Sequence, residues 1–193
     1  NLPHDYMIES NVSESAASGP ASGYYTQGVA YYTKLIDIPQ EWEQEAVYLH
    51  FDGIMMNATV DINGCKAILQ HNGYIPFSVN ITPYLYFGKK NRVTITVAPS
   101  MQPNSRWYSG SGIYRNVWLV KTSPVHVAQW GTFIRNKEIS TDKAVMDMTL
   151  QLENNTGKSV QASVKTDIYE QDETGNPKGT KVASCPAMKV KIE

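Results

Sequence analysis

Two alternating segments flank a two-residue turn in the run Ala58-Thr59-Val60-Asp61-Ile62-Asn63-Gly64-Cys65-Lys66-Ala67-Ile68-Leu69. Apolar and polar residues alternate over residues 58–62, which is the pattern of a β-strand with one buried face. Asn63-Gly64 is the strongest short signal for a β-hairpin, because both residue types tolerate the positive φ angles of a type I′ turn. Residues 65–69 then form the returning strand, so we expect an antiparallel hairpin here.

The same alternation recurs on both sides of this hairpin, with breaks at Gly, Pro, Asn and Asp. Further strands are predicted at residues 28–38, 46–51, 77–81, 92–97 and 113–121. Between them we expect loops at 6–23 and 98–112, a polar turn at 88–91, and one helical turn with Thr82 as N-cap and Pro83 at its first position. Helical periodicity is almost absent, which predicts an all-β antiparallel sandwich or barrel.

A break at Thr122-Ser123-Pro124 predicts two domains, one over residues 1–124 and one over residues 125–193. The second part shows about four strands, at 125–127, 144–153, 160–170 and 181–192, whereas an immunoglobulin-like sandwich has about seven. It is therefore interpreted as a truncated sandwich. Unfinished sheets expose strand edges and apolar faces, so we expect the chain to form a homo-oligomer, with second domains pairing across a two-fold axis.

Composition excludes several classes of function. The 193 residues carry a formal net charge of -1 without a basic stripe, which argues against a nucleic-acid partner. No run approaches the ~20 apolar residues of a membrane helix. Cys65 and Cys185 make neither a disulfide framework nor a metal motif, so we expect no metal and no cofactor. The compartment stays open: periplasmic or secreted if a leader was removed, otherwise cytoplasmic.

Four stretches occur in order: Leu2-Pro3-His4-Asp5, then Phe51-Asp52-Gly53 through Asn63-Gly64, then His71-Asn72-Gly73-Tyr74-Ile75-Pro76-Phe77, and last Arg106-Trp107-Tyr108-Ser109-Gly110-Ser111-Gly112-Ile113-Tyr114-Arg115-Asn116-Val117-Trp118-Leu119. Together they resemble the amino-terminal domain of glycoside hydrolase family 2, most closely its β-galactosidase-like members. The resemblance spans residues 1 to about 124. It implies a jelly-roll, galactose-binding-domain-like sandwich followed by the start of an immunoglobulin-like sandwich.

The resemblance also implies a parent enzyme that hydrolyses terminal β-glycosidic bonds by the retaining route. Retaining enzymes use two carboxylates, which this family places on a TIM barrel of ~250 residues. The present sequence has no such alternation of strands and helices, so no catalytic residue is assigned to it. We expect a non-catalytic amino-terminal fragment whose partners are the parent's barrel and, through the complete enzyme, carbohydrate. The alternatives are a free-standing carbohydrate-binding module and a purely structural interaction domain.

Arg106, Trp107 and Tyr108 are the candidate substrate-binding residues, because the resemblance implies that their loop helps to wall the innermost sugar pocket. A guanidinium can donate a fixed fork of hydrogen bonds, and aromatic rings can cover a sugar face. These residues can equally serve only to pack the first domain against the barrel. Gly110 and Gly112 are expected to turn the chain with positive φ angles, while Arg115 anchors the turn through a buried hydrogen-bonded pair. His4 and Asp5 are expected to form an ion pair.

Overall fold

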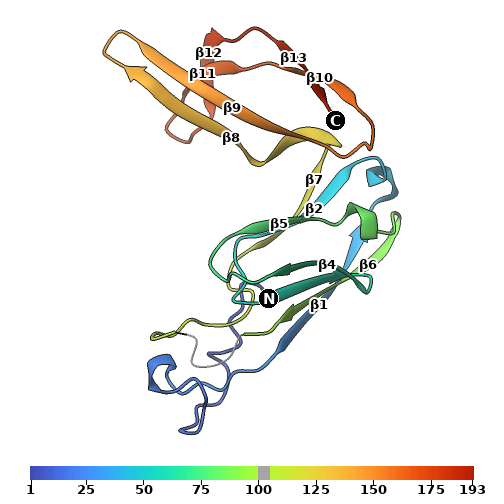
Figure 1. Ribbon diagram of the computed structural model, residues 1–193, viewed down its shortest axis with the longest axis vertical. Coiled ribbons are helices and arrows are strands. Elements are labelled where there is room, and N and C mark those ends of the chain that lie inside the picture. The colour runs from blue at the N-terminus through green and yellow to red at the C-terminus, as the bar shows by residue number, and fades with distance from the viewer. Residues whose placement is uncertain (100–104) are drawn as a thin grey trace. The chain divides into compact units, whose positions relative to one another are not determined.

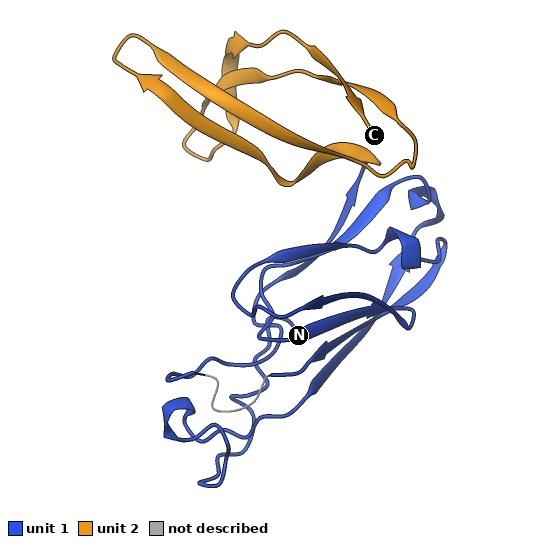
Figure 2. Ribbon diagram, in the orientation of Figure 1, with its two compact units in different colours: residues 1–123 blue, residues 124–193 orange. Residues whose placement is uncertain are grey.

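The computed structural model describes residues 1–99 and 105–193, and it divides into two compact units, 1–123 and 124–193 (Figure 2). The all-β prediction is confirmed. Within the described residues, helical structure is limited to short 3₁₀ turns, and no helix is long and apolar enough to cross a membrane. These turns are η1 (Pro20–Ser22), η2 (Gln40–Trp42) and η3 (Thr82–Tyr84).

Unit 1 is built from two antiparallel sheets (Figure 1). The first has four strands in the order β1 (Ala30–Ile38), β6 (Lys89–Val97), β3 (Ala58–Ile62) and β4 (Cys65–Gln70). The second has three in the order β5 (Phe77–Asn80), β2 (Ala46–Phe51) and β7 (Val117–Thr122). Strands that are neighbours in space are often distant in sequence, as β1 and β6 are.

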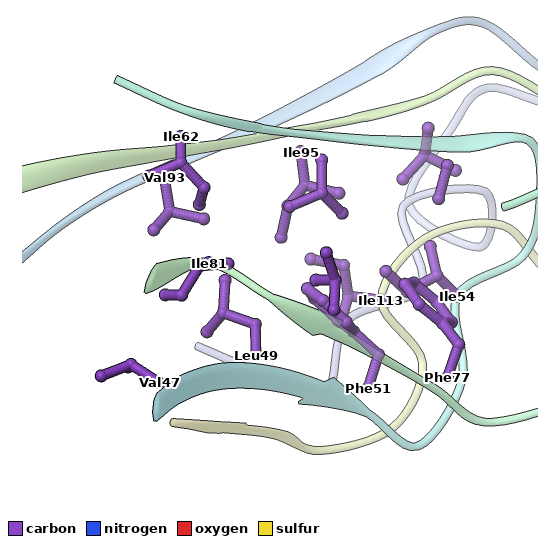
Figure 3. Packing of buried hydrophobic residues seen from close by; sticks show 14 of the residues in the cluster. Val47, Leu49, Phe51, Ile54, Ile62, Phe77, Ile81, Val93, Ile95 and Ile113 are labelled. Carbon is purple, nitrogen blue, oxygen red and sulfur yellow. The ribbon is translucent and has the colours of Figure 1, made fainter. Parts of the chain in front are cut away.

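The core lies between these two sheets, where their inward-facing side chains meet (Figure 3). Val47, Leu49 and Phe51 alternate along β2 with partly exposed residues, and all three are buried. Phe51 is fully buried and its ring stacks on Phe77 with centroids 4.7 Å apart. Period-two burial is thus the physical consequence of the alternation in the sequence.

The hairpin prediction at Asn63-Gly64 is confirmed. β3 pairs with β4 through Ile62 and Cys65, and the two turn residues have φ angles of 53° and 86°. Both angles lie in the left-handed region, as a type I′ turn requires. Asn63 does more than turn the chain, because its side-chain amide also donates to the backbone carbonyl oxygen of Tyr84 at 2.8 Å.

Replacing Gly64 by valine is expected to cost about 1–2 kcal/mol of stability, because an L-residue is strained at this φ angle. A Cβ atom at Gly64 would meet no heavy atom within 4 Å, so the cost comes from the backbone alone. Gly28→Val is the matched control, since Gly28 is equally open but has no positive φ. Urea denaturation of both variants measures the difference; equal midpoints would contradict the prediction.

Three local predictions for unit 1 need correction. β6 begins at Lys89, so the expected polar turn is largely strand, because residues 89–91 pair with residues 36–38 of β1. Thr82 is not the N-cap of η3; its hydroxyl accepts a hydrogen bond from the backbone N–H of Val47 at 2.8 Å. Ile113 precedes β7 and packs in the core instead of starting that strand.

Unit 2 contains six strands in three antiparallel pairs. The pairs are β8 (Val125–Ile139) with β9 (Ala144–Asn154), β10 (Val160–Val164) with β13 (Met188–Ile192), and β11 (Asp167–Gln171) with β12 (Pro177–Ser184). The expected count of about four was too low. The chain changes partner strand at residues 165–166 and again at 185–187, so the segment 160–170 divides into β10 and β11 and the segment 181–192 falls on β12 and β13. That unit 2 is a truncated immunoglobulin-like sandwich remains a prediction.

Large apolar side chains are exposed on the long β8–β9 ribbon of unit 2. Phe133 is 64% exposed and Ile139 is 66% exposed. Oligomerisation through this unit remains a prediction that light scattering at high protein concentration can test.

Candidate functional site

The loop between β6 and β7 carries the residues that the sequence singled out. The structure describes it from Ser105 onward, so residues 100–104 of the predicted loop 98–112 lie outside the described part of the chain. Arg106, Trp107 and Tyr108 are all exposed, and Trp107 has an exposed fraction of 59%. From Gly110 to Ile113 the chain is buried. The loop therefore has a fixed base and a projecting tip.

The carboxylate of Asp5 fixes this loop: it accepts three hydrogen bonds, two from the loop and one from its own amino-terminal segment. The hydroxyl of Tyr108 donates at 2.6 Å, and the backbone N–H groups of Ser111 and Met7 donate at 2.8 Å and 3.0 Å. Hydrogen bonds to an ionised acceptor are about twice as strong as neutral ones. Because Asp5 lies over a hundred positions earlier in the sequence, this anchor ties the amino-terminal segment to the loop.

Backbone hydrogen bonds continue the same junction. His4 N–H donates to the carbonyl of Ile113 at 2.7 Å, and Tyr6 N–H donates to that of Ser111 at 3.0 Å. On the other side, Gly112 and Met55 exchange hydrogen bonds at 2.8 Å and 3.0 Å. The buried strip 110–113 is therefore held between the amino-terminal segment and the chain that follows β2.

Gly110 and Gly112 have the positive φ angles that the sequence predicts, 68° and 132°. A Cβ atom on Gly112 would lie 2.5 Å from the carbonyl oxygen of His4, and one on Gly110 would lie 2.8 Å from a carboxylate oxygen of Asp5. Both glycines are therefore required by close approach as well as by backbone conformation.

Hydrogen bonds to its backbone hold the projecting tip in place. The carbonyl oxygen of Trp107 accepts hydrogen bonds from the hydroxyls of Ser105 at 2.6 Å and of Ser22 at 3.4 Å. These bonds hold the Trp107 backbone while its ring projects into solvent. The Tyr108 ring packs edge-on against Tyr25 with centroids 5.5 Å apart.

Burial raises the pKa of the Tyr108 hydroxyl well above its ordinary value, and the hydrogen bond to the neighbouring Asp5 carboxylate raises that pKa further. Both causes disfavour a phenolate. Tyr108 therefore stays protonated throughout the physiological pH range, and its hydroxyl donates its hydrogen bond to Asp5.

A match to a known family covers this whole assembly. The model described as "Glycosyl hydrolases family 2, sugar binding domain" matches residues 3–123, which include both sheets of unit 1, the Asp5 anchor and the loop. The chain belongs to glycoside hydrolase family 2.

Relatives within family 2 show the same affiliation. The chain is 37% identical over 172 residues to the β-galactosidase BoGH2A of Bacteroides ovatus, a match that covers 89% of this chain and 20% of that protein. It is 30% identical over 165 residues to a β-glucuronidase of Bacteroides fragilis, covering 80% of this chain and 23% of the relative. The chain thus spans about a fifth to a quarter of these relatives.

A solved family 2 structure from Bacteroides cellulosilyticus is similar to the entire chain. Its TM-score is 0.87 at 31% sequence identity, and the match covers 100% of this chain and 25% of that one. A β-glycosidase from Bacteroides vulgatus gives a TM-score of 0.80 at 30% identity. Both matches extend over unit 2 as well as unit 1.

Two expectations about the family 2 motifs are wrong. Arg115 is exposed and lies over the ring of Tyr114, 5.4 Å from its centroid, so it makes no buried pair in this chain. His4 does not pair with Asp5, because its ring nitrogens contact the Tyr32 hydroxyl at 2.9 Å and the Glu9 carboxylate at 3.3 Å. The Asp5 carboxylate instead accepts hydrogen bonds from Tyr108 and Ser111 of the loop and from Met7.

Asp5 is the residue whose role sequence reasoning missed. A signal was present, since Asp5 closes the first family-like stretch while Tyr108 and Ser111 belong to the last. Nothing in the sequence pattern indicates that two such distant stretches meet.

The described residues contain no group of three His, Cys, Asp or Glu side chains placed to hold a metal ion.

Proposed function

We propose that this chain is the non-catalytic amino-terminal part of a β-galactosidase-like retaining glycosidase, in which it acts as scaffold and as an accessory wall of the active site. One observation carries the proposal: the exposed side chains of Arg106 and Trp107 stand on a loop whose base is buried and anchored by Asp5. Loops that a rigid sandwich holds in place are common carriers of binding residues. The relatives named β-galactosidase and β-glucuronidase support the reaction class.

The two projecting residues suit contact with a sugar. Arg106 can offer a planar fork of N–H donors to hydroxyl groups or to a carboxylate of the catalytic site. Trp107 can cover the apolar face of a pyranose ring. Tyr108 takes a different role in this proposal: its hydroxyl is bonded to Asp5 and its ring meets Tyr25, so it positions the loop rather than touching substrate.

Hydrolysis of nitrophenyl β-galactoside by the 193-residue chain, side by side with the full-length parent, tests the first half of the proposal. Inactivity of the chain together with activity of the parent is expected, because the two carboxylates of a retaining mechanism are proposed to lie elsewhere in the parent. Activity of the purified chain alone would overturn the proposal.

Changing Arg106 and Trp107 together to alanine in the full-length enzyme tests the second half. Loss of one hydrogen bond to a charged group costs about 1.5–3 kcal/mol, so kcat/KM is expected to fall roughly tenfold to a hundredfold. The matched control is Arg135→Ala with Trp118→Ala, which removes the same two residue types from exposed strand positions outside both proposed sites.

The melting temperature separates a substrate wall from interdomain packing. If Arg106 and Trp107 form a wall of the substrate site, the double variant loses kcat/KM while its melting temperature stays unchanged. Packing alone predicts a lower melting temperature with normal kinetics in the folded fraction, and that outcome would remove Arg106 and Trp107 from the active site.

A further inference from the structure

A hollow of about 460 Å³ opens on unit 1 beside the Asn63-Gly64 turn. Apart from Thr94, its lining consists of Leu35, Asn63, Gly64, Tyr86, Lys90 and Arg92. The volume falls within the ~300–1,000 Å³ of typical small-molecule sites. None of these residues belongs to the loop at 105–113 or to its anchor.

The strand pattern places two cations of this hollow on the solvent face of the first sheet. Successive side chains of a strand point to opposite faces. Val93 and Ile95 of β6 point into the core (Figure 3), so Lys90 and Arg92 point outward. Leu35 of β1 stands directly opposite Arg92 in the ladder and is 56% exposed.

Two side-chain amides, the buried Asn91 and the partly buried Asn63, hold the wall of the hollow in place. Asn91 is fully buried, and its side-chain oxygen accepts from the backbone N–H of Tyr86 at 2.7 Å while its amide donates to the Tyr86 carbonyl at 2.9 Å. Asn63 donates to the same Asn91 oxygen at 2.7 Å, and it accepts from the backbone N–H of Arg92 at 2.9 Å. A hydrogen-bond network centred on a buried amide in this way is rigid.

The two cations of the hollow, Lys90 and Arg92, form no ion pair with the carboxylates that the structure describes. The lining itself contains no acidic residue. Asp37 and Asp61 stand opposite Lys90 and Thr94 in the ladders, so two carboxylates share this face of the sheet without forming an ion pair with either cation.

An aromatic ring completes the arrangement. Tyr86 is 58% exposed, although Asn91 fixes its backbone. A ring of this kind presents an apolar face with a polar tip, which suits the alternating C–H and O–H surface of a pyranose. The guanidinium of Arg92 matches the two oxygens of a carboxylate in a bidentate geometry.

We propose that this hollow binds an acidic saccharide, that is, a pyranose ring bearing a carboxylate, at a site separate from the proposed active-site wall. The carboxylate faces Lys90 and Arg92, and the sugar ring contacts Tyr86 and Leu35. A nucleic acid fits less well, because it needs a basic stripe and this chain carries a formal net charge of -1.

Nuclear magnetic resonance titration of the ¹⁵N-labelled chain tests the proposal with a matched pair of disaccharides. Cellobiose and cellobiouronic acid differ only in the carboxylate of the terminal ring. We expect cellobiouronic acid to shift the amide signals of Leu35, Gly64 and Arg92, and to bind at least about tenfold more tightly than cellobiose. Lys90→Gln with Arg92→Gln is expected to weaken that binding at least about tenfold.

The control variant is Lys178→Gln with Lys189→Gln, which removes two exposed charges from unit 2 and is expected to bind normally. Tyr86→Ala distinguishes contact with the sugar ring from simple attraction of an anion. This variant is expected to bind cellobiouronic acid more weakly but to bind acetate as the unchanged chain does. The proposal would be overturned if the two disaccharides bound equally, or if acetate shifted the amide signals as cellobiouronic acid does. Tighter binding of a DNA oligonucleotide would also overturn it. Normal binding by the Lys90 and Arg92 variant would place the site elsewhere.

Discussion

Replacing Phe51 by alanine is expected to lower the free energy of unfolding of unit 1 by about 3–5 kcal/mol, the usual cost of deleting a buried aromatic ring. Phe51 is fully buried between the two sheets and stacks on Phe77 (Figure 3). Both sheets converge on this ring, so the surrounding side chains cannot easily collapse into the cavity. A whole domain is stable by only about 5–15 kcal/mol, so the change removes a large part of the total.

Trp118→Ala provides the control for this experiment. Trp118 lies on β7, next to β2 in the same sheet, and carries a larger ring, but it is 53% exposed. Its loss is expected to cost less than about 1 kcal/mol, as surface changes usually do. Because the chain divides into two compact units, amide hydrogen exchange in β2 and β3 is the appropriate measurement, as it reports on unit 1 alone. Similar protection in both variants would show that the core is not where the structure puts it.

Replacing Asp5 by alanine is expected to lower the stability of unit 1 by roughly 2–4 kcal/mol and to release the loop that carries Arg106 and Trp107. The change leaves the backbone N–H of Ser111 without its acceptor, and Ser111 is only 1% exposed. A buried donor without a partner costs about 1–3 kcal/mol, and the lost bonds to a charged group add to that. In the parent enzyme, the proposed wall predicts a fall in kcat/KM as well.

Glu9→Ala is the matched control, because it also removes one negative charge from the amino-terminal segment. The Glu9 side chain is 69% exposed and contacts the ring of His4 at 3.3 Å, so its loss is expected to cost between 0 and about 1 kcal/mol. Urea denaturation followed by tryptophan fluorescence measures both variants. Equal midpoints for the two variants would refute the anchoring role of Asp5.

The Asp5 anchor and the acidic-saccharide hollow make separable claims. Asp5→Ala disturbs the loop at 105–113 but leaves Lys90, Arg92 and the Asn91 network untouched, so cellobiouronic acid is expected to bind the folded variant normally. Conversely, the Lys90 and Arg92 variant is expected to leave hydrolysis of a small nitrophenyl glycoside by the parent unchanged. Failure of either proposal therefore leaves the other standing.

The sequence by itself determined what depends on neighbouring residues. Alternation gave the strands of unit 1 to within a few positions, since burial of one face follows directly from a period of two. Asn63-Gly64 specified its hairpin, and Gly110 and Gly112 specified their left-handed turns, because the cost of a positive φ angle is paid within a single residue. The four family-like stretches determined the family.

Tertiary structure decided what depends on residues that are distant in sequence. It brought Asp5 to Tyr108 and Ser111, gave His4 the partners Tyr32 and Glu9, and left Arg115 exposed. It also turned Asn91 from an expected turn residue into the buried centre of a network. A carboxylate or an amide has several acceptable partners, and only the packing of the two sheets determines which of them lies within hydrogen-bonding distance.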